Sequence, residues 1–295
     1  MKLLFPFAKR FIAGDSFSSA IPVIQKLMDD GYEVSVDYLG ELSKTGEDCE
    51  RAFQQYCEII DYYCRIDISI KLSQLGLKID KDLCIYYISA LVEKAQEHEN
   101  TIRFDMEDDS LIQDTIDICL KLREFYPNVG CALQTNMYRT QQDLGHLMHE
   151  KVSIRLVKGA YKGNNKIAYQ NKQQIEKLYL KQSLKLLSDR CRSYYHMKEK
   201  DAPVHAIGTH DEDIIKQIIH YSKSINIKKD DFDFEFLFGI RRDLQKELKG
   251  LGYNVRLYVP FGQQWLPYTL RRLREFKNLK FVFFNVFREL FSKKP

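Results

Sequence analysis

Apolar residues along the chain follow two alternating patterns, one repeating about every two residues and one about every 3.6 residues. Short runs rich in β-branched and aromatic residues predict eight strands, at 32–38, 66–73, 101–107, 129–136, 152–160, 204–209, 232–239 and 254–261. Between these runs, apolar residues recur at i, i+3 and i+4, as at Leu184 and Leu187, which predicts amphipathic helices. The order is that of consecutive βα units.

Eight such units without a Pro/Gly/Ser-rich linker predict a closed (βα)8 barrel, with a doubly wound sheet as the alternative. A helix precedes the first strand: Asp15 or Ser16 can cap it, and Ala20 and Ile24 belong to its apolar face. We therefore expect an N-terminal helical segment over residues 1–31 and a barrel catalytic domain over 32–295. The fifth unit is unusually long, so we expect an insertion there, which begins with the polar loop 162–169 and overhangs the active-site end.

Composition excludes several classes of protein. The net charge is only +4, from 45 Lys+Arg and 41 Asp+Glu, and no long basic block offers a surface to nucleic acid. No apolar run is long enough to span a membrane or to serve as a signal peptide. The seven cysteines show no CxxC spacing and predict reduced thiols in the cytoplasm. His146 and His149 lack further ligands, so we expect no metal site.

Familiar catalytic and nucleotide-binding motifs are missing. The chain has no GxGxxG, so nothing supports a Rossmann fold, and no GxxxxGK[ST] loop for phosphates. It has neither HExxH nor GxSxG, so a zinc protease and a nucleophilic serine have no support.

Charged residues at the predicted strand ends are the first candidates for chemistry, because barrel active sites lie at the carboxyl ends of the strands. Lys71, Asp105 and Arg155 stand in the second, third and fifth runs. Inside a barrel such groups must be paired, so they form either a neutralising structural network or a site. Ionisable or amide groups at six of the eight strand ends favour a site.

A helix after the last strand supplies further candidates. Tyr268, Arg271, Arg272 and Glu275 are spaced i, i+3, i+4 and i+7, so they share one face. That face is either solvated, with an Arg271–Glu275 ion pair, or a clamp in which two guanidinium groups bind a carboxylate. Its position after the last barrel strand favours the clamp.

Several of these segments together resemble proline dehydrogenase of the monofunctional bacterial type. The resemblance runs from about Phe11 to the C-terminus and rests on KLSQLG at 71–76, DMED at 105–108, RLVKGAY at 155–161, THD at 209–211, YVPFG at 258–262 and the W-x-P-Y-x-x-R-R-L-x-E pattern at 265–275. It implies a distorted (βα)8 barrel with a C-terminal helix over the active-site face, which binds FAD without a Rossmann fold. The implied reaction is oxidation of L-proline to Δ1-pyrroline-5-carboxylate by hydride transfer to flavin N5, the first step of proline catabolism.

The resemblance also implies roles for individual residues. Asp105 and Arg155 would be catalytic, and Glu41 would be a gate carboxylate paired with Arg271. The substrate pocket would comprise Lys71, Tyr161, Leu237, Tyr258, Tyr268, Arg271 and Arg272 together with Glu41. The residues implied to bind FAD are Met106, Gln134, Lys158, Gly159, Ala160, Thr209 and His210. The base that deprotonates the substrate amine stays open between Asp105, with Lys71 as its ion partner, and water.

The implied partners are a quinone electron acceptor and a separate pyrroline-5-carboxylate dehydrogenase. A quinone acceptor would bring an otherwise cytoplasmic protein into peripheral contact with the cytoplasmic membrane. Two other functions remain open. One is a Schiff-base aldolase or lyase with Lys71 or Lys158 as nucleophile, which needs a lysine of depressed pKa; the other is a flavin-binding protein without turnover.

Overall fold

The computed structural model describes residues 8–159, 164–195 and 203–277. Its strands form a closed parallel barrel, in which β8 pairs with β1, so the doubly wound alternative is wrong. The strands are β1 (Glu33–Tyr38), β2 (Asp67–Ile70), β3 (Thr101–Phe104), β4 (Val129–Gln134), β5 (Ser153–Val157), β6 (His205–Gly208), β7 (Phe232–Leu237) and β8 (Asn254–Phe261). The predicted strand at each of the eight positions is confirmed.

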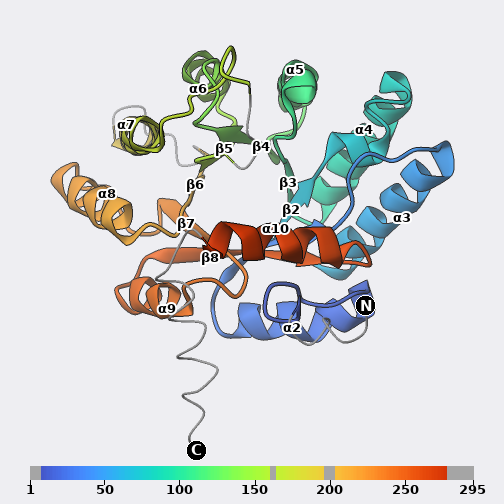
Figure 1. Cartoon of the computed structure of the whole chain (residues 1–295), viewed down its shortest axis with the longest axis horizontal. Coiled ribbons are helices and arrows are strands. Elements are labelled where there is room, and N and C mark those ends of the chain that lie inside the picture. The colour runs from blue at the N-terminus through green and yellow to red at the C-terminus, as the bar shows by residue number, and fades with distance from the viewer. Residues whose placement is uncertain (1–7, 160–163, 196–202, 278–295) are drawn as a thin grey trace, which may run out of the picture.

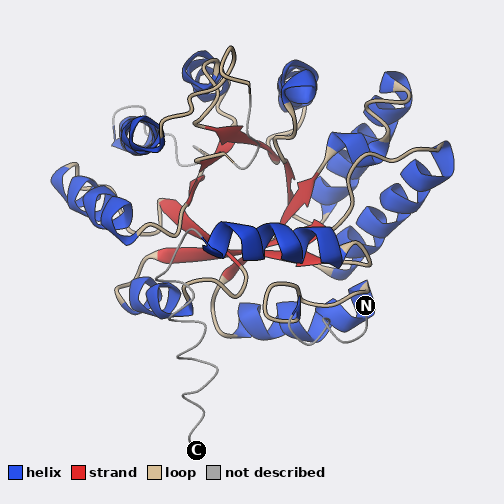
Figure 2. Cartoon of the chain, in the orientation of Figure 1, coloured by secondary structure: helices blue, strands red, loops and turns tan. Residues whose placement is uncertain are grey.

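Helices surround the barrel, as Figures 1 and 2 show. They are α2 (Phe17–Asp29), α3 (Gly46–Tyr62), α4 (Lys81–Glu97), α5 (Ile112–Arg123), α6 (Thr140–His149), α7 (Lys172–Tyr195), α8 (Glu212–Ser224), α9 (Arg242–Gly250) and α10 (Trp265–Lys277). Two short 3-10 turns, η2 (Leu72–Leu75) and η3 (Asp109–Leu111), follow β2 and β3. The apolar faces read from the sequence therefore cover the outside of the sheet.

The predicted helix before the first strand is α2. Ser16 is its N-cap and forms a capping box with Ser19. Phe17, Ala20 and Ile24 are buried in the same core as the barrel strands, and the Phe17 ring centre lies 5.5 Å from that of Phe261 on β8. The helix is therefore packed onto the seam where the barrel closes.

Several strands end earlier than their apolar runs predict. β2 ends at Ile70 rather than residue 73, and β3 ends at Phe104 rather than residue 107. The chain leaves the sheet there, because Leu72–Leu75 form the turn η2, which Gly76 ends with a φ of 98°. Lys71 and Asp105 consequently lie just beyond the carboxyl ends of their strands.

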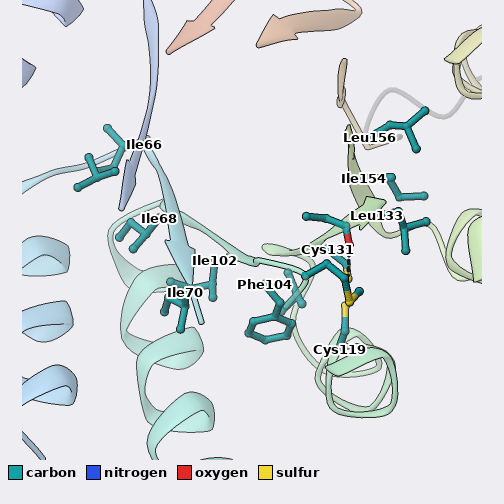
Figure 3. Packing of buried hydrophobic residues seen from close by; sticks show 14 of the residues in the cluster. Ile66, Ile68, Ile70, Ile102, Phe104, Cys119, Cys131, Leu133, Ile154 and Leu156 are labelled. Carbon is teal, nitrogen blue, oxygen red and sulfur yellow. Dashed lines mark hydrogen bonds between the residues drawn. The ribbon is translucent and has the colours of Figure 1, made fainter. Parts of the chain in front are cut away.

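Apolar and polar residues alternate along the strands according to the side of the sheet they face. Ile68 and Ile70 on β2, and Ile102 and Phe104 on β3, are fully buried in the apolar layer between sheet and helices (Figure 3). Ser69 lies between the two isoleucines of β2 and faces the barrel interior. On several other strands, the residues that alternate with buried apolar residues are charged. Barrel interiors are usually filled by branched apolar side chains, so this interior is unusually polar.

The predicted insertion is partly a longer helix. α7 has 24 residues and accounts for much of the extra length. The described part of the predicted loop packs on the segment after β4: the Tyr138 amide donates to the Ile167 carbonyl at 2.9 Å, and the Tyr169 amide to the Asn136 carbonyl at 2.7 Å. That segment lies at the carboxyl end of the barrel. Residues 162 and 163, the first two of the predicted loop, lie outside the described residues.

Candidate active site

Arg155 on β5 is the centre of an ionic network in the barrel interior. Its side chain is 4% exposed, and its Nη1 lies 2.7 Å from Asp105 Oδ1 while its Nε lies 2.7 Å from Glu235 Oε2. Nη1 also donates to Ser69 Oγ at 2.9 Å. Ser69 is on β2, Asp105 follows β3 and Glu235 is on β7, none of which neighbours β5. The guanidinium therefore reaches across the barrel and joins β5 to strands with which β5 itself is not paired.

Lys71 and Tyr258 complete the surroundings of Asp105. Lys71 Nζ lies 2.7 Å from Asp37 Oδ1 and 3.3 Å from Asp105 Oδ2, and the Tyr258 hydroxyl donates to Asp105 Oδ2 at 2.6 Å. Burial acts to lower the pKa of Lys71, but the charges of Asp37 and Asp105 outweigh it, so the pKa is raised well above its usual value. Burial and the Asp105 charge raise the pKa of Tyr258. Lys71 is therefore cationic and Tyr258 is a neutral donor.

The charges of this network do not cancel. Three carboxylates, on Asp37, Asp105 and Glu235, lie within 3.3 Å of two cations, on Lys71 and Arg155. A fourth carboxylate, on Asp67, lies 3.6 Å from Arg155 and is also paired with Arg103. Glu235 Oε1 is buried and has no hydrogen-bond partner among the described residues. The carboxyl end of the barrel interior thus favours an additional positive group.

The helix α10 lies across this end of the barrel, in front of β8 in Figure 1. Trp265 and Tyr268 pack with Leu39 after β1 and Ile240 after β7, both at the carboxyl end. Arg272 is 8% exposed, and its guanidinium carbon lies 5.2 Å from the centre of the Tyr268 ring. The last helix therefore covers the end of the barrel that contains the Lys71–Asp105–Arg155 network.

The Arg271 side chain faces the loop after β1 and forms an ion pair there. Its Nη2 lies 3.2 Å from Glu41 Oε1, and both side chains are 35% exposed. A cavity of about 210 Å³ adjoins the pair, lined by Leu39, Gly40, Glu41, Gln264, Pro267, Tyr268 and Arg271. The partner in the structure is Glu41, as the resemblance implies; the Glu275 side chain lies outside the described part of the chain.

Residues assigned to the cofactor lie at the ends of β4, β5 and β6. The Gln134 side chain donates from Nε2 to the Glu107 carbonyl at 3.0 Å, while its buried Oε1 has no hydrogen-bond partner within the described ranges. Lys158 Nζ lies 2.8 Å from Asp211 Oδ2. Gly159 has a φ of 111°, and a Cβ there would lie 1.9 Å from the Asn136 Oδ1. This side of the opening therefore offers an unused acceptor and a cation, and Gly159 lets the Asn136 side chain pack against the backbone.

His210 and Thr209 follow β6 on the same side. The backbone N–H of Leu237 donates to His210 Nε2 at 3.0 Å. Burial, followed by the charges of Arg272 and Arg241, lowers the pKa of His210 to about 3. The imidazole is consequently neutral, with its proton on Nδ1, and it can donate one hydrogen bond. Thr209 is 4% exposed and accepts from the Asp211 backbone N–H at 3.2 Å.

A flavin fits the donors and acceptors on this side. The free Gln134 Oε1 can accept from a ring N–H, and His210 Nδ1 and Lys158 can donate to ring carbonyls or phosphates. The groups assigned to the substrate, Lys71, Tyr258 and the α10 arginines, come from β2, β8 and α10 instead. Met106, 8% exposed, follows β3 between the two sets. Ala160 and Tyr161 lie outside the described residues.

Three members of the network were not assigned a role from the sequence: Asp37, Ser69 and Glu235. Each stands one residue from an apolar residue of its strand, as Glu235 does between Phe234 and Phe236. Strict alternation of polar and apolar residues in a barrel whose outside is covered by helices places the polar set in the interior. The alternation of polar and apolar residues along the strands is therefore the sequence pattern from which these three residues could have been predicted.

Fold and site define the class of protein: a (βα)8-barrel enzyme whose active site is built on the carboxyl ends of its strands. The chain belongs to the proline dehydrogenase family, because the family model described as "Proline dehydrogenase" matches residues 20–282. Proline dehydrogenase 2 of Bacillus subtilis (strain 168) is 35% identical over 281 residues, which cover 94% of this chain and 89% of that protein. Proline dehydrogenase of Deinococcus radiodurans is 35% identical over 285 residues, with 93% and 88% covered.

Solved structures agree with the fold. Proline utilization A from Bdellovibrio bacteriovorus, inactivated by N-propargylglycine, superposes with a TM-score of 0.82 at 22% sequence identity. The match covers 91% of this chain and 32% of that one. The predicted barrel and the predicted family are confirmed.

Other features bear on cofactors and location. All seven cysteines lie within the described residues and are free thiols. In the described part of the chain, no three His, Cys, Asp or Glu side chains are grouped to hold a metal ion. None of the helices described is both long enough and apolar enough to cross a membrane.

Proposed function

We propose that this enzyme oxidises L-proline to Δ1-pyrroline-5-carboxylate, the first step of proline catabolism, with FAD as its flavin. The observation that carries the proposal is the distribution of charge around one opening. Arg271 and Arg272 lie on α10 above a network with one carboxylate more than cations. A zwitterionic amino acid matches that field, with its carboxylate toward the arginines and its ammonium toward Asp105.

The two arginines bind the substrate carboxylate by charge-assisted hydrogen bonds, each worth about 1.5–3 kcal/mol. Because Glu41 pairs with Arg271, an entering carboxylate takes the place of Glu41 on that guanidinium. Tyr258 and Lys71 hold Asp105 in place below the substrate. The Tyr258 ring, whose centre lies 5.1 Å from the Arg155 guanidinium carbon, excludes larger rings and hydroxylated analogues.

The family implies a flavin, and FAD is the specific form we propose. When bound, a flavin would supply the two-electron acceptor that no side chain provides for the hydride of the carbon next to the proline nitrogen. Arg155 and Lys158 would supply fixed positive charge near the bound flavin, which would stabilise the negative charge that reduction adds.

The substrate amine must first lose a proton, and two acceptors remain open. Asp105, which already interacts with Arg155, Lys71 and Tyr258, is one of them. Water is the other acceptor. Either way, the role of this chain is to hold the nitrogen next to Asp105.

The electron acceptor and the next enzyme are also part of the proposal. We place the enzyme in the cytoplasm, with electrons passing to a quinone by peripheral contact with the cytoplasmic membrane, and the product passing to a separate pyrroline-5-carboxylate dehydrogenase. Family membership supports these partners. Supplying a soluble quinone analogue or membrane vesicles to the proline-reduced enzyme tests the acceptor directly.

The central test is anaerobic titration of the purified protein with proline. We expect a yellow protein whose released flavin is FAD, bleaching of the flavin band by proline, and one equivalent of an o-aminobenzaldehyde-reactive product. Prolinamide, which lacks the carboxylate charge, should bleach the flavin only at far higher concentration. A colourless protein, or a flavin that proline does not reduce, would overturn the proposal, the latter in favour of a flavin-binding protein without turnover.

The lyase alternative is disfavoured by Lys71. A Schiff-base nucleophile needs a depressed pKa, whereas the pKa of Lys71 is raised. Lys158 is held between Asp211 and Glu176, at 2.8 and 3.4 Å. Borohydride in the presence of a carbonyl substrate should therefore trap neither lysine.

A further inference from the structure

The loop that carries Glu41 is fixed to the KLSQLG segment after β2. The Leu42 backbone N–H donates to Ser73 Oγ at 3.1 Å, and the Ser43 N–H donates to the Ser73 carbonyl at 3.2 Å. Ser43 Oγ also donates to the Gln74 carbonyl at 2.7 Å. The backbone on the C-terminal side of Glu41 is thus tied to two consecutive residues of another loop, and Ser73 supplies two of the three contacts.

Ser73 is in turn held by Glu107, the third residue of the DMED segment. Glu107 Oε1 accepts from the Ser73 backbone N–H at 3.0 Å, and its Oε2 accepts from the Ser73 hydroxyl. Both side chains are nearly inaccessible, at 4% exposure for Glu107 and 1% for Ser73. Among the described residues, no cation forms an ion pair with Glu107.

The directions of these hydrogen bonds are fixed by their chemistry. Glu107 accepts from both the Ser73 N–H and the Ser73 hydroxyl, so the hydroxyl proton points at Glu107. The lone pairs of Ser73 Oγ are then left for the Leu42 N–H. Glu107 therefore determines the orientation of the hydroxyl that anchors the Glu41 loop.

We propose that Glu107, acting through Ser73, is a positioning residue for the Glu41–Arg271 pair and so controls the entry of substrate. The inference rests on the proposed function and deepens it. A buried carboxylate without a counter-ion is costly, and the same shape is available from glutamine without that cost. The charge is useful only if its two strong hydrogen bonds to Ser73 are needed.

Glutamine cannot reproduce this arrangement. Its side chain has one acceptor and one donor group, whereas Ser73 presents two donors to Glu107. If the amide oxygen takes the Ser73 N–H, the amide N–H donates to Ser73 Oγ and competes with the Leu42 N–H. If the amide is flipped, the Ser73 N–H loses its acceptor. Glu107→Gln should therefore loosen the loop without changing the volume of the site.

The kinetic test compares Glu107→Gln with Glu41→Ala in anaerobic flavin bleaching. For Glu107→Gln we expect the half-saturating proline concentration to change at least about threefold, in the same direction as for Glu41→Ala, with the limiting bleaching rate within about twofold of wild type. In the double variant, Glu107→Gln should add nothing, because its effect passes through Glu41. Asp108→Asn, which alters the neighbouring Lys78–Asp108 surface pair, should leave both parameters unchanged.

A second readout does not depend on activity. Lys44 lies in the same loop and is exposed, so trypsin should cut after it faster in Glu107→Gln and in Ser73→Ala than in wild type, as followed by mass spectrometry of the holoenzyme. Ser73→Ala gives the same test if Glu107→Gln does not fold.

Three results would overturn the inference. The first is wild-type kinetics and wild-type cleavage at Lys44 in both Glu107→Gln and Ser73→Ala. The second is additivity of the effects of Glu107→Gln and Glu41→Ala, and the third is a lower limiting bleaching rate in Glu107→Gln at an unchanged half-saturating proline concentration. Each presupposes that proline bleaches the wild-type flavin. If it does not, the proposed function fails, but cleavage at Lys44 still reports whether Glu107 holds the loop.

Discussion

The two ends of the barrel interior both contain buried arginines and carboxylates, but they use them differently. At the amino end, Arg103 Nε lies 2.7 Å from Asp67 Oδ2, and Arg256 Nε lies 2.6 Å from Asp233 Oδ2, so each arginine has one close aspartate. Longer contacts of 3.6 Å join Asp67 to Arg155 and Arg256 to Glu33. At the carboxyl end, Asp105 is shared by Arg155, Lys71 and Tyr258, and the carboxylates outnumber the cations. Pairs that neutralise each other stabilise the barrel, whereas the uneven sharing leaves a charge for a ligand.

If the active site were assigned by cavity size alone, it would be placed at the amino end of the barrel. A cavity of about 330 Å³ lies at the amino end and is larger than the one beside Arg271. Its lining includes four arginines, of which Arg65, Arg103 and Arg256 are ion-paired with carboxylates. The fourth, Arg123, donates to the backbone carbonyls of Tyr126 and Glu150. Carboxylates in excess of cations, and not the volume, distinguish the active end.

The sharpest way to break this comparison is to remove one arginine from each end. Arg155→Ala leaves Glu235 without its cation, and Arg103→Ala leaves Asp67 with only the 3.6 Å contact to Arg155, so each should lower the free energy of unfolding by about 3–5 kcal/mol. Only Arg155→Ala should also lower turnover per folded molecule by well over tenfold, a loss of ~2–4 kcal/mol of transition-state stabilisation. Denaturant unfolding and anaerobic bleaching measure the two effects. Equal rates in the two variants would show that the ends do not differ in function.

The clamp on α10 gives the next largest effect. Arg271→Ala and Arg272→Ala should each weaken proline binding by roughly 10–100-fold, because each loses charge-assisted bonds to the carboxylate. Arg65→Ala is the control from the amino end, where the Arg65–Glu99 pair is on the surface, and binding should stay within about twofold. If the α10 variants keep the wild-type preference for proline over prolinamide, the carboxylate is bound elsewhere.

Tyr258 on β8 and Tyr253, which directly precedes this strand, allow the two ends of the barrel to be compared with matched substitutions. Tyr258→Phe removes the 2.6 Å hydrogen bond to Asp105 and should weaken proline binding or bleaching by about tenfold. Tyr253, at the amino end, is 4% exposed, and its hydroxyl has no hydrogen-bond partner in the described residues. Tyr253→Phe should therefore leave kinetics unchanged and stability equal or slightly higher. A kinetic defect in Tyr253→Phe would argue against a division between the two ends.

The two histidines of β6 and its following loop predict a pH dependence. Burial, followed by nearby arginines, lowers the pKa of both His205 and His210 to about 3. Between pH 6.5 and 3 the unfolded chain binds protons that the folded one does not, so stability falls as the pH falls. From pH 6.5 to 5.5 the loss should be about 1 kcal/mol per histidine. His205→Asn, whose Oδ1 can accept the Ile154 N–H in place of Nδ1, should remove about half of this slope in denaturant unfolding.

The sequence predicted the eight βα units, because periods of two and 3.6 residues are set by which side of each element is buried. Lys71, Asp105 and Arg155 could be assigned to one end of the barrel, since parallel strands end together. Which carboxylates join them could not be predicted. That Arg155 reaches Glu235 and Ser69 depends on the tilt of the strands and the length of the side chain. Neither the strand tilt nor the reach of the side chain can be read from the spacing of residues along the chain.

The pairing of β1 with β8 has a consequence for how the protein is made. Arg256 donates to the carbonyl of Val34, which lies 222 residues earlier in the chain. Until the ribosome has released β8, β1 and β7 each present an unpaired edge to other nascent chains, and folding must await this distant contact. Tyr258 and α10 are also synthesised late, because they lie near the C-terminal end of the described chain. Nascent chains stalled before Asn254 should therefore aggregate or bind chaperones, and should acquire neither a closed barrel nor a place for the substrate.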